Sequence, residues 1–211
     1  MQKGLKMGKT EAKKIKNWLF QNIANFITVF GLVAAFWHLA ILIYSPETLW
    51  LIIILSALIG LTDFIDGKVA RHFKINSRTG SALDRLRDKI LICPLLIMLA
   101  WQTWPLNKSS MAFATLTIGL ALLLVLIELI LFGAWLIGLF KNLDISANKY
   151  GKIKMFLQFA VVMIWLSLLT AEKYFSFPEL KFSIYLIDFL LIITIYFAVK
   201  SLEGYYKRYT A

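Results

Sequence analysis

The chain has 211 residues, of which 60% are hydrophobic and 17% are charged, and its mean hydropathy is +0.73. A soluble domain of this length cannot bury so much apolar side chain, and the chain is far too apolar to be disordered. The net charge is +11, from 23 Lys and Arg against 12 Asp and Glu, which in a soluble protein would indicate nucleic acid. The composition instead predicts an integral membrane protein.

Six segments of the chain are apolar and can each form a helix of roughly 20 residues, the length needed to cross a bilayer. These segments are residues 23–44, 49–71, 90–107, 109–140, 155–171 and 182–199. The second, fourth and sixth reach this length only if their helices continue past Asp63, Glu128 and Asp188. The first follows a basic stretch, as a signal peptide would, but it is longer than a cleaved signal and is expected to be retained. The predicted fold is an all-α integral membrane protein with six transmembrane helices.

Lysine and arginine are concentrated in alternate connections between these segments. Most of them lie in the N-terminal segment, in residues 68–89 and 141–154, and from residue 200 onward. Because cytoplasmic loops are the basic ones, both termini and the two long connections are predicted to face the cytoplasm. The surplus of positive charge then indicates anionic lipid as a partner, and no nucleic acid.

Residues 1–20 form a basic segment next to the first span. Lysines precede Trp18, Leu19 and Phe20, a pattern typical either of a helix lying on an anionic membrane surface or of an ordinary basic flank. No internal repeat or Ser/Pro-rich linker divides the rest of the sequence. The predicted organisation is an N-terminal juxtamembrane segment with a basic interfacial helix, followed by one membrane domain over residues 21–211.

Four of the 12 acidic residues are grouped where the second span ends and the third begins. They are Asp63, Asp66, Asp84 and Asp88. At the spacings i, i+3 and i, i+4, the two members of each pair share one face of a helix. Because the connection between the two helices is short, the helices are expected to pack as neighbours and the four carboxylates to converge.

Acids at membrane depth need compensation, because like charges on one helix face repel and each acid costs about 2.5–3.5 kcal/mol. One interpretation is that basic side chains close in sequence neutralise them. These are Arg71, Arg85, Arg87 and Lys89. The other interpretation is a divalent cation such as Mg²⁺ or Mn²⁺, which prefers oxygen ligands. The sequence has no Cys/His cluster that would favour zinc.

The complete spacing of this region resembles a known family signature. It reads Asp63-x-x-Asp66-Gly67-x-x-Ala70-Arg71, then eight residues, Gly80, three residues, Asp84, three residues and Asp88. All eight positions are similar to the signature of the CDP-alcohol phosphotransferase family. The segment from Gly151 to Gln158, with Lys152 and Lys154, looks like the Gly-Lys-x-Lys-Thr-x-x-Gln element of phosphatidylglycerophosphate and cardiolipin synthases.

The resemblance implies an enzyme that moves a phosphatidyl group from CDP-diacylglycerol to an alcohol and releases CMP. Its site would lie at the cytoplasmic face of the membrane, and this membrane is expected to be a bacterial cell membrane. Two Mg²⁺ or Mn²⁺ ions would be bound by Asp63, Asp66, Asp84 and Asp88. Of these, Asp88 would also act as the general base. The cytidine diphosphate would be bound by Asp63, Gly67, Ala70, Arg71 and Gly80. Families of this kind usually form dimers, so a homodimer is expected.

The chain departs at three places from relatives that make phosphatidylglycerophosphate. Such relatives usually carry an arginine near the end of a stretch in the first span, where this chain has Gly31. They also tend to have an Arg-Glu pair in the fourth span, where this chain has Glu128 without an arginine beside it. They also read Leu-Asp-Pro-x-Ala-Asp-Lys where this chain reads Leu83-Asp-Arg-Leu-Arg-Asp-Lys89. Because arginine is the usual ligand of an acceptor phosphate, the acceptor alcohol is left open. Candidate acceptor-binding residues in this chain are Arg78, Arg85, Arg87, Lys152 and Lys154.

Phosphatidylglycerophosphate synthase is the favoured function, from the overall likeness and from residues 151–158. Within the family, the alternatives are cardiolipin synthase, which residues 57–63 and 80–84 also resemble, and an enzyme with another acceptor. A membrane transporter is the alternative from a different class, because Glu128 and Asp188 lie within spans. These two acids are either acceptor-pocket residues or buried hydrogen-bonding partners of other helices.

Overall fold

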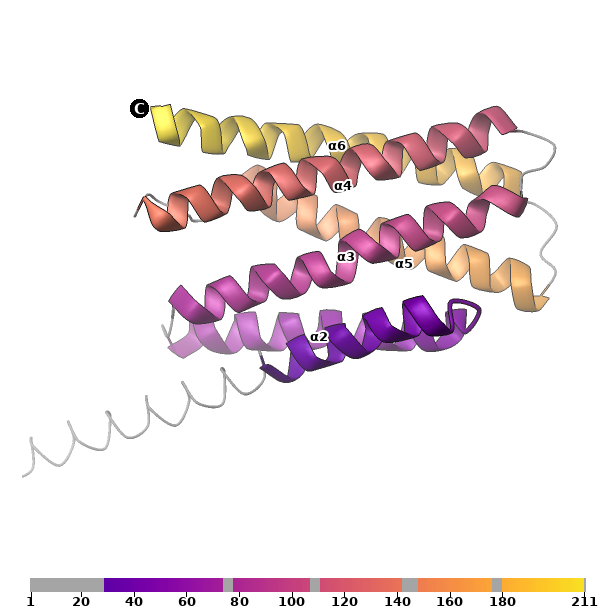
Figure 1. Cartoon of the computed structure of the whole chain (residues 1–211), viewed down its shortest axis with the longest axis horizontal. Helices are drawn as coiled ribbons and strands as arrows, with labels where there is room; N and C mark the ends of the chain where they lie inside the picture. The colour runs from indigo at the N-terminus through magenta and orange to yellow at the C-terminus, as the bar shows by residue number, and fades with distance from the viewer. Residues whose placement is uncertain (1–28, 74–77, 107–110, 142–147, 176–179, 211) are drawn as a thin grey trace, which may run out of the picture.

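The computed structural model of the chain describes residues 29–73, 78–106, 111–141, 148–175 and 180–210 (Figure 1). Its helices are Val29–Tyr44, α2 (Leu49–Phe73), α3 (Arg78–Leu106), α4 (Met111–Phe140), α5 (Lys149–Phe175) and α6 (Leu180–Thr210). No strand occurs in these ranges, so the all-α prediction is confirmed for this part of the chain. The predicted interfacial helix in residues 1–20 lies outside the described residues.

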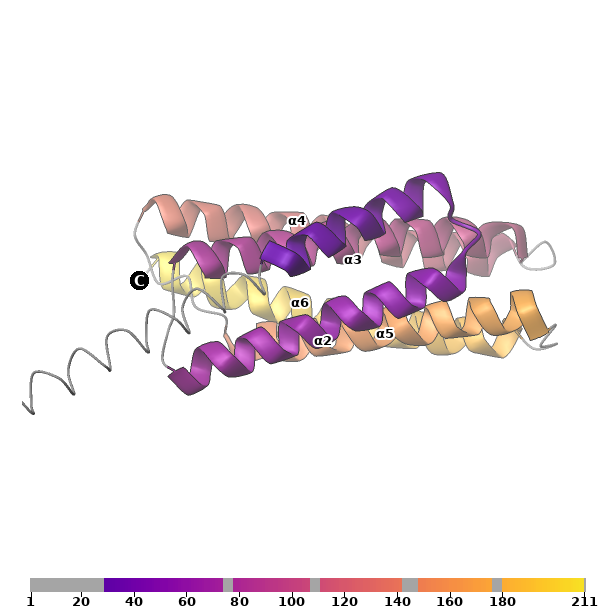
Figure 2. The ribbon, with the colours of Figure 1, turned by 90° about the horizontal axis from the view of Figure 1, so that it is seen from below.

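The helices form a bundle in which successive helices alternate in direction (Figures 1 and 2). Short connections favour this arrangement, because they leave consecutive helices antiparallel and side by side. One end of the bundle holds the last turns of α2, α4 and α6 together with the first turns of α3 and α5 (Figure 1). The basic residues of these helix ends, such as Lys141, Lys149 and Lys207, therefore gather at that end, which is called the basic end below.

Three of the described helices are long and apolar enough to cross a membrane. They are Thr115–Phe140, Lys149–Phe175 and Ile184–Tyr209. Two further apolar stretches, Val29–Tyr44 and Leu49–Thr62, are shorter. By helix length and composition, the chain is an integral membrane protein.

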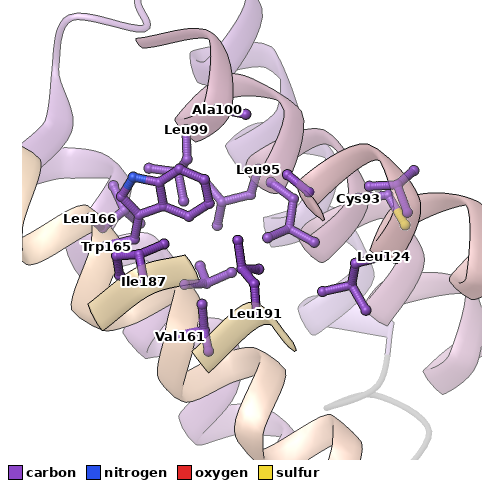
Figure 3. Close-up of a cluster of buried hydrophobic side chains, with 14 of the residues drawn as sticks. Cys93, Leu95, Leu99, Ala100, Leu124, Val161, Trp165, Leu166, Ile187 and Leu191 are labelled. Carbon is purple, nitrogen blue, oxygen red and sulfur yellow. The ribbon is translucent and has the colours of Figure 1, made fainter. Parts of the chain in front are cut away.

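Large aliphatic side chains from four helices fill the centre of the bundle (Figure 3). Leu99 of α3, Leu124 of α4, Leu166 of α5 and Leu191 of α6 are each completely buried there. Trp165 lies among them, and its indole N–H donates to the hydroxyl of buried Thr103 at 3.0 Å. The most extensive helix contacts among the described residues reflect this core, with α6 packed on α5 and α4, and α3 packed on α4.

Apolar side chains also cover the outside of the bundle. Trp37 is 67% exposed, Leu126 54% and Phe189 59%, and they come from three different helices. In water such a surface would be strongly unfavourable, whereas in a bilayer it faces hydrocarbon. The exposed apolar residues thus fit the lipid-facing surface that the composition predicted.

The described part of α2 contacts α5 as well as the first helix and α3. Among the described residues, α2 packs most closely on α5, where a Cβ on Gly60 would lie 2.5 Å from the ring of Phe159. On the α3 side, Ile59 of α2 and Leu91 of α3 meet Ala35 of the helix Val29–Tyr44 in a small buried cluster. The first helix, α2 and α3 therefore share this cluster.

Candidate active site

The motif residues lie on two helices at the basic end of the bundle. The second helix continues past Asp63, as predicted, and ends at Phe73, while α3 begins at Arg78. Each pair of motif aspartates therefore lies about one helical turn apart at the end of α2 or the start of α3. Side chains of residues 63–84 lie outside what the structure describes, so of the four carboxylates only that of Asp88 is located, and it is half-buried.

The donor set of the motif fits a hard divalent cation. Four carboxylates, two on each helix, offer only oxygen ligands, which suits Mg²⁺ or Mn²⁺. Within the described part of the chain, no group of three or more His, Cys, Asp or Glu side chains could hold a metal ion. The side chains of three motif aspartates lie outside what the structure describes, so the fit rests on the chemistry and helical spacing of the donors.

Glu128 of α4 lies at the centre of a buried ion cluster beside the motif. Its carboxylate is completely buried and pairs with Lys89 of α3 and with Lys154 of α5. The Lys154 ammonium is 2.5 Å from Glu128 Oε1, and its side chain is only 6% exposed. The cluster therefore ties three helices together next to Asp88, the residue that precedes Lys89.

This cluster decides between the two interpretations of Glu128. The buried partner is the one observed, because two lysines from other helices surround the carboxylate. The structure also separates the two lysines of the 151–158 segment: Lys154 is committed to Glu128, whereas Lys152 is exposed. Sequence reasoning missed these pairings, although an acid within an apolar span was the signal for a buried partner.

Successive basic residues of α3 extend toward different helices. The Arg85 guanidinium donates to the hydroxyl of Tyr205 on α6 at 3.1 Å and lies 5.3 Å from the ring centroid of Trp135 on α4. Arg87 is completely buried and reaches the helix Val29–Tyr44. Successive residues of a helix are about 100° apart around its axis. The helix face that holds Asp84 and Asp88 is therefore flanked by Arg85 on one side and Arg87 on the other. The side chain of Arg78 lies outside the described part.

Asn148 fixes the start of α5 and with it the 151–158 segment. Its Oδ1 accepts the backbone N–H of Gly151 at 2.7 Å, which is an N-terminal helix cap, and its Nδ2 donates to the Ser201 carbonyl of α6 at 2.9 Å. A side chain on Gly204 would collide with the Asn148 amide, so α6 comes close only because this residue is glycine. The sequence signal for this cap was an asparagine three residues before Gly151.

Replacing Asn148 by alanine should destabilise the protein by about 1 kcal/mol, because the cap of α5 is lost. Asn148→Ser is the matched control, since serine can still accept the Gly151 N–H, and it should be the more stable of the two variants. Thermal unfolding of the purified protein in detergent measures both. Equal unfolding temperatures for the serine and alanine variants would show that the cap contributes nothing.

Two other buried polar residues join helices away from the motif. Thr117 of α4 donates to Asp188 Oδ1 of α6 at 2.7 Å, near the end of the bundle opposite the basic end. His38 Nε2 and the Ser56 hydroxyl form a hydrogen bond of 2.9 Å between the first helix and α2. Asp188 is therefore a hydrogen-bonded partner of another helix, the second of the two alternatives for this residue.

The sequence model of the CDP-alcohol phosphatidyltransferase family matches residues 21–199. The chain belongs to this family. The match covers all the described helices except the last turns of α6, together with both halves of the motif. The family resemblance read from the eight motif residues is thus confirmed.

Relatives with assigned names give a consistent picture. The chain is 23% identical over 193 residues to the CDP-diacylglycerol–glycerol-3-phosphate 3-phosphatidyltransferase of Haemophilus influenzae, over 86% of this chain and 92% of that protein. It is 31% identical over 97 residues to the protein of the same name from Blochmanniella floridana, over 41% of this chain and 50% of the relative, so the match spans half of that relative's length. A cardiolipin synthase (CMP-forming)/mitochondrial hydrolase fusion protein of Schizosaccharomyces pombe is 45% identical over 53 residues, which are 25% of this chain and 9% of that protein.

Proposed function

We propose that this protein is an enzyme that transfers a phosphatidyl group from CDP-diacylglycerol to an alcohol and releases CMP. The observation that carries the proposal is the eight-residue motif, which occupies adjoining ends of α2 and α3 at the basic end of the bundle. Membership of the CDP-alcohol phosphatidyltransferase family and the names of the relatives support it.

The proposed topology has six membrane helices, both termini in the cytoplasm and the motif at the cytoplasmic face. Gathering of the basic helix ends at one end of the bundle supports this orientation. A site at this face suits a lipid donor, because the acyl chains stay in the bilayer while the nucleotide stays in water. A bacterial cell membrane and a homodimer belong to the same proposal.

The proposed binding roles follow the motif. Two Mg²⁺ or Mn²⁺ ions would be held by Asp63, Asp66, Asp84 and Asp88. When bound, the ions would neutralise the pyrophosphate and stabilise the departing CMP. The cytidine diphosphate would be bound by Asp63, Gly67, Ala70, Arg71 and Gly80. Glycine and alanine are suited to this role because they let a ligand approach the helix closely.

Asp88 is the proposed general base. Its carboxylate would accept the proton of the acceptor hydroxyl as that oxygen attacks the phosphorus of the phosphatidyl group. The new P–O bond forms to the acceptor while the P–O bond to CMP breaks, and CMP leaves with the bonding electrons. Lys89 is held by Glu128, which fixes the turn of α3 on which Asp88 lies.

Glycerol 3-phosphate is the proposed acceptor, and the names of the relatives support it. Phosphatidylglycerol is the second candidate, since one relative is a cardiolipin synthase, and another alcohol is the third. Of the five candidate acceptor-binding residues, Arg78, Arg85 and Lys152 are the proposed ones, because Lys154 is paired with Glu128 and Arg87 is completely buried. Transport is less well supported, because Glu128 and Asp188, the acids that suggested it, have structural partners on other helices.

Release of CMP from CDP-diacylglycerol tests the proposal. Purified protein with Mg²⁺ or Mn²⁺ is incubated with glycerol 3-phosphate, phosphatidylglycerol or a neutral polyol, and CMP is quantified. Glycerol 3-phosphate should give the fastest release, and a chelator should stop release until excess Mg²⁺ restores it. Failure of every alcohol to accelerate CMP release would refute the proposed function, and release that continues in chelator would refute the metal.

A further inference from the structure

Three polar side chains from three helices lie together at the basic end of the bundle. Arg85 of α3 donates to the hydroxyl of Tyr205 on α6 at 3.1 Å. Its guanidinium also lies over the ring of Trp135 on α4, 5.3 Å from the ring centroid, which is within the range of a cation–π contact. Trp135 is only 2% exposed and Tyr205 only 5%. These three residues are called the Arg85 cluster below.

Two members of the cluster have donor groups that the described part of the chain does not use. The indole N–H of Trp135 is buried and has no acceptor among the described residues. The Tyr205 hydroxyl accepts a hydrogen bond from Arg85, and its own proton has no acceptor among those residues. A buried donor without an acceptor is unfavourable, because it has lost its hydrogen bond to water. The cluster therefore offers donors to a group that carries several acceptor oxygens.

Neighbouring aromatic rings hold the cluster in place. Phe132 stacks on Trp135, with ring centroids 5.6 Å apart. Tyr209 packs beside Tyr205 at 5.9 Å, and its hydroxyl donates to the Ala134 carbonyl at 3.0 Å. The end of α6 is thereby joined to α4 next to the indole. Donors that are already fixed lose little freedom when a ligand binds, so this arrangement favours binding.

The cluster lies one helical turn from the proposed general base. Asp88 follows Arg85 by three residues on α3, which is about 4.5 Å along the helix axis, and both side chains are half-buried. Lys89, the next residue, contacts Glu128 on α4. Trp135 follows Glu128 by seven residues, which places both on one face of α4. An anion bound at the cluster would therefore lie between α3 and α4, on the side of the ion cluster that is nearer the basic end.

We propose that the Arg85 cluster is a subsite for a phosphate group of the acceptor, in which Trp135 and Tyr205 bind beside Arg85. The inference rests on the proposed function and names the class of acceptor. A phosphate group brings anionic oxygens that match a planar guanidinium and can also accept from neighbouring N–H and O–H groups. A neutral polyol brings no anionic oxygen. Glycerol 3-phosphate and phosphatidylglycerol both carry a phosphate, so either satisfies the subsite.

Trp135→Phe tests the subsite, because phenylalanine keeps a ring under the guanidinium and removes only the N–H donor and part of the ring volume. Loss of one hydrogen bond to a charged ligand should raise the KM for the acceptor at least about tenfold, with a smaller change in kcat. Tyr205→Phe should raise the KM for the same reason. Of glycerol 3-phosphate and phosphatidylglycerol, the one whose KM rises is the acceptor that uses the subsite. A wild-type KM in both variants would overturn the proposal.

Trp165→Phe is the matched control for the loss of ring volume. Trp165 is also 2% exposed, but it lies in the apolar core and its N–H already donates to Thr103. Its replacement should lower the unfolding temperature more than Trp135→Phe does, because a hydrogen bond is lost as well as volume. The KM for the acceptor should stay at the wild-type value. An equal rise of KM in Trp165→Phe would assign the effect to the fold and overturn the subsite.

Binding without turnover separates this inference from the proposed function. The unfolding temperature is measured in detergent with a chelator, so that no metal ion holds the ligand, after addition of inorganic phosphate, glycerol 3-phosphate, phosphatidylglycerol or glycerol. At least one phosphate-bearing ligand should raise it in the wild type and less in Trp135→Phe, and glycerol should not. Stabilisation without CMP release from any alcohol would refute the proposed function and support the subsite. CMP release without stabilisation by any phosphate-bearing ligand would refute the subsite alone.

Discussion

Replacing Asp88 by asparagine should lower the rate of CMP release by about 10²- to 10⁴-fold, because the amide cannot accept the proton of the acceptor hydroxyl. The change is nearly isosteric, so the protein should still insert in the membrane, fold and bind CDP-diacylglycerol at saturating Mg²⁺. Turnover is measured as CMP release under these conditions, and binding is measured by titration with the lipid nucleotide. Wild-type turnover in the variant would exclude Asp88 as the general base.

Asp188→Asn is the matched control for this experiment. It makes the same chemical change in a buried aspartate whose partner is Thr117, toward the opposite end of the bundle. An asparagine there can still accept the threonine hydroxyl, so turnover should stay close to that of the wild type. A loss as large as that of Asp88→Asn would mean that the effect of either variant comes from the fold.

Replacing Glu128 by glutamine should destabilise the protein by about 3–5 kcal/mol, the usual cost of removing one partner from a buried ion pair. The variant leaves two ammonium groups facing each other, of which that of Lys154 is almost completely buried. Unfolding of the purified protein in detergent measures the loss. Since Lys89 and Asp88 are adjacent on α3, the rate of CMP release should fall as well.

Two further variants test whether burial explains this effect. Glu203→Gln removes an acid from an exposed pair with Lys200 and should cost no more than about 1 kcal/mol, because water screens the charges. A triple variant with Glu128→Leu, Lys89→Met and Lys154→Met removes the whole buried cluster and should be more stable than Glu128→Gln alone. Equal losses for Glu128→Gln and Glu203→Gln would contradict the structural role of the cluster.

The sequence was informative about the helices because local patterns determine them. Apolar stretches predicted the all-α fold, and the length needed to cross a bilayer predicted that the second helix continues past Asp63. The basic connections alternate along the sequence, and the helix ends that they join lie together at one end of the bundle (Figure 1). Each of these inferences needed only neighbouring residues.

The pairings that shape the site could not be read in the same way. Lys89 and Glu128 are 39 positions apart, and Gly31 and Arg87 are 56 apart, so their contacts depend on which helices become neighbours and at what rotation. Short connections suggested that α2 and α3 would be neighbours, and among the described residues they meet in a small cluster to which the first helix contributes Ala35. The sequence showed Glu128 within a span and Gly31 in the first helix, but only the packing of the helices identified Lys89 and Arg87 as their partners.

The ion cluster also bears on how the chain enters the membrane. A lone charged side chain in a bilayer costs a few kcal/mol, so α4 would insert poorly with Glu128 unpaired. Because α3 and α4 are consecutive and antiparallel, they can enter as a hairpin in which Lys89 already neutralises this carboxylate. Lys154 can join only after α5 has followed, so the order of helices along the chain would allow the acid to have a partner from the hairpin onward.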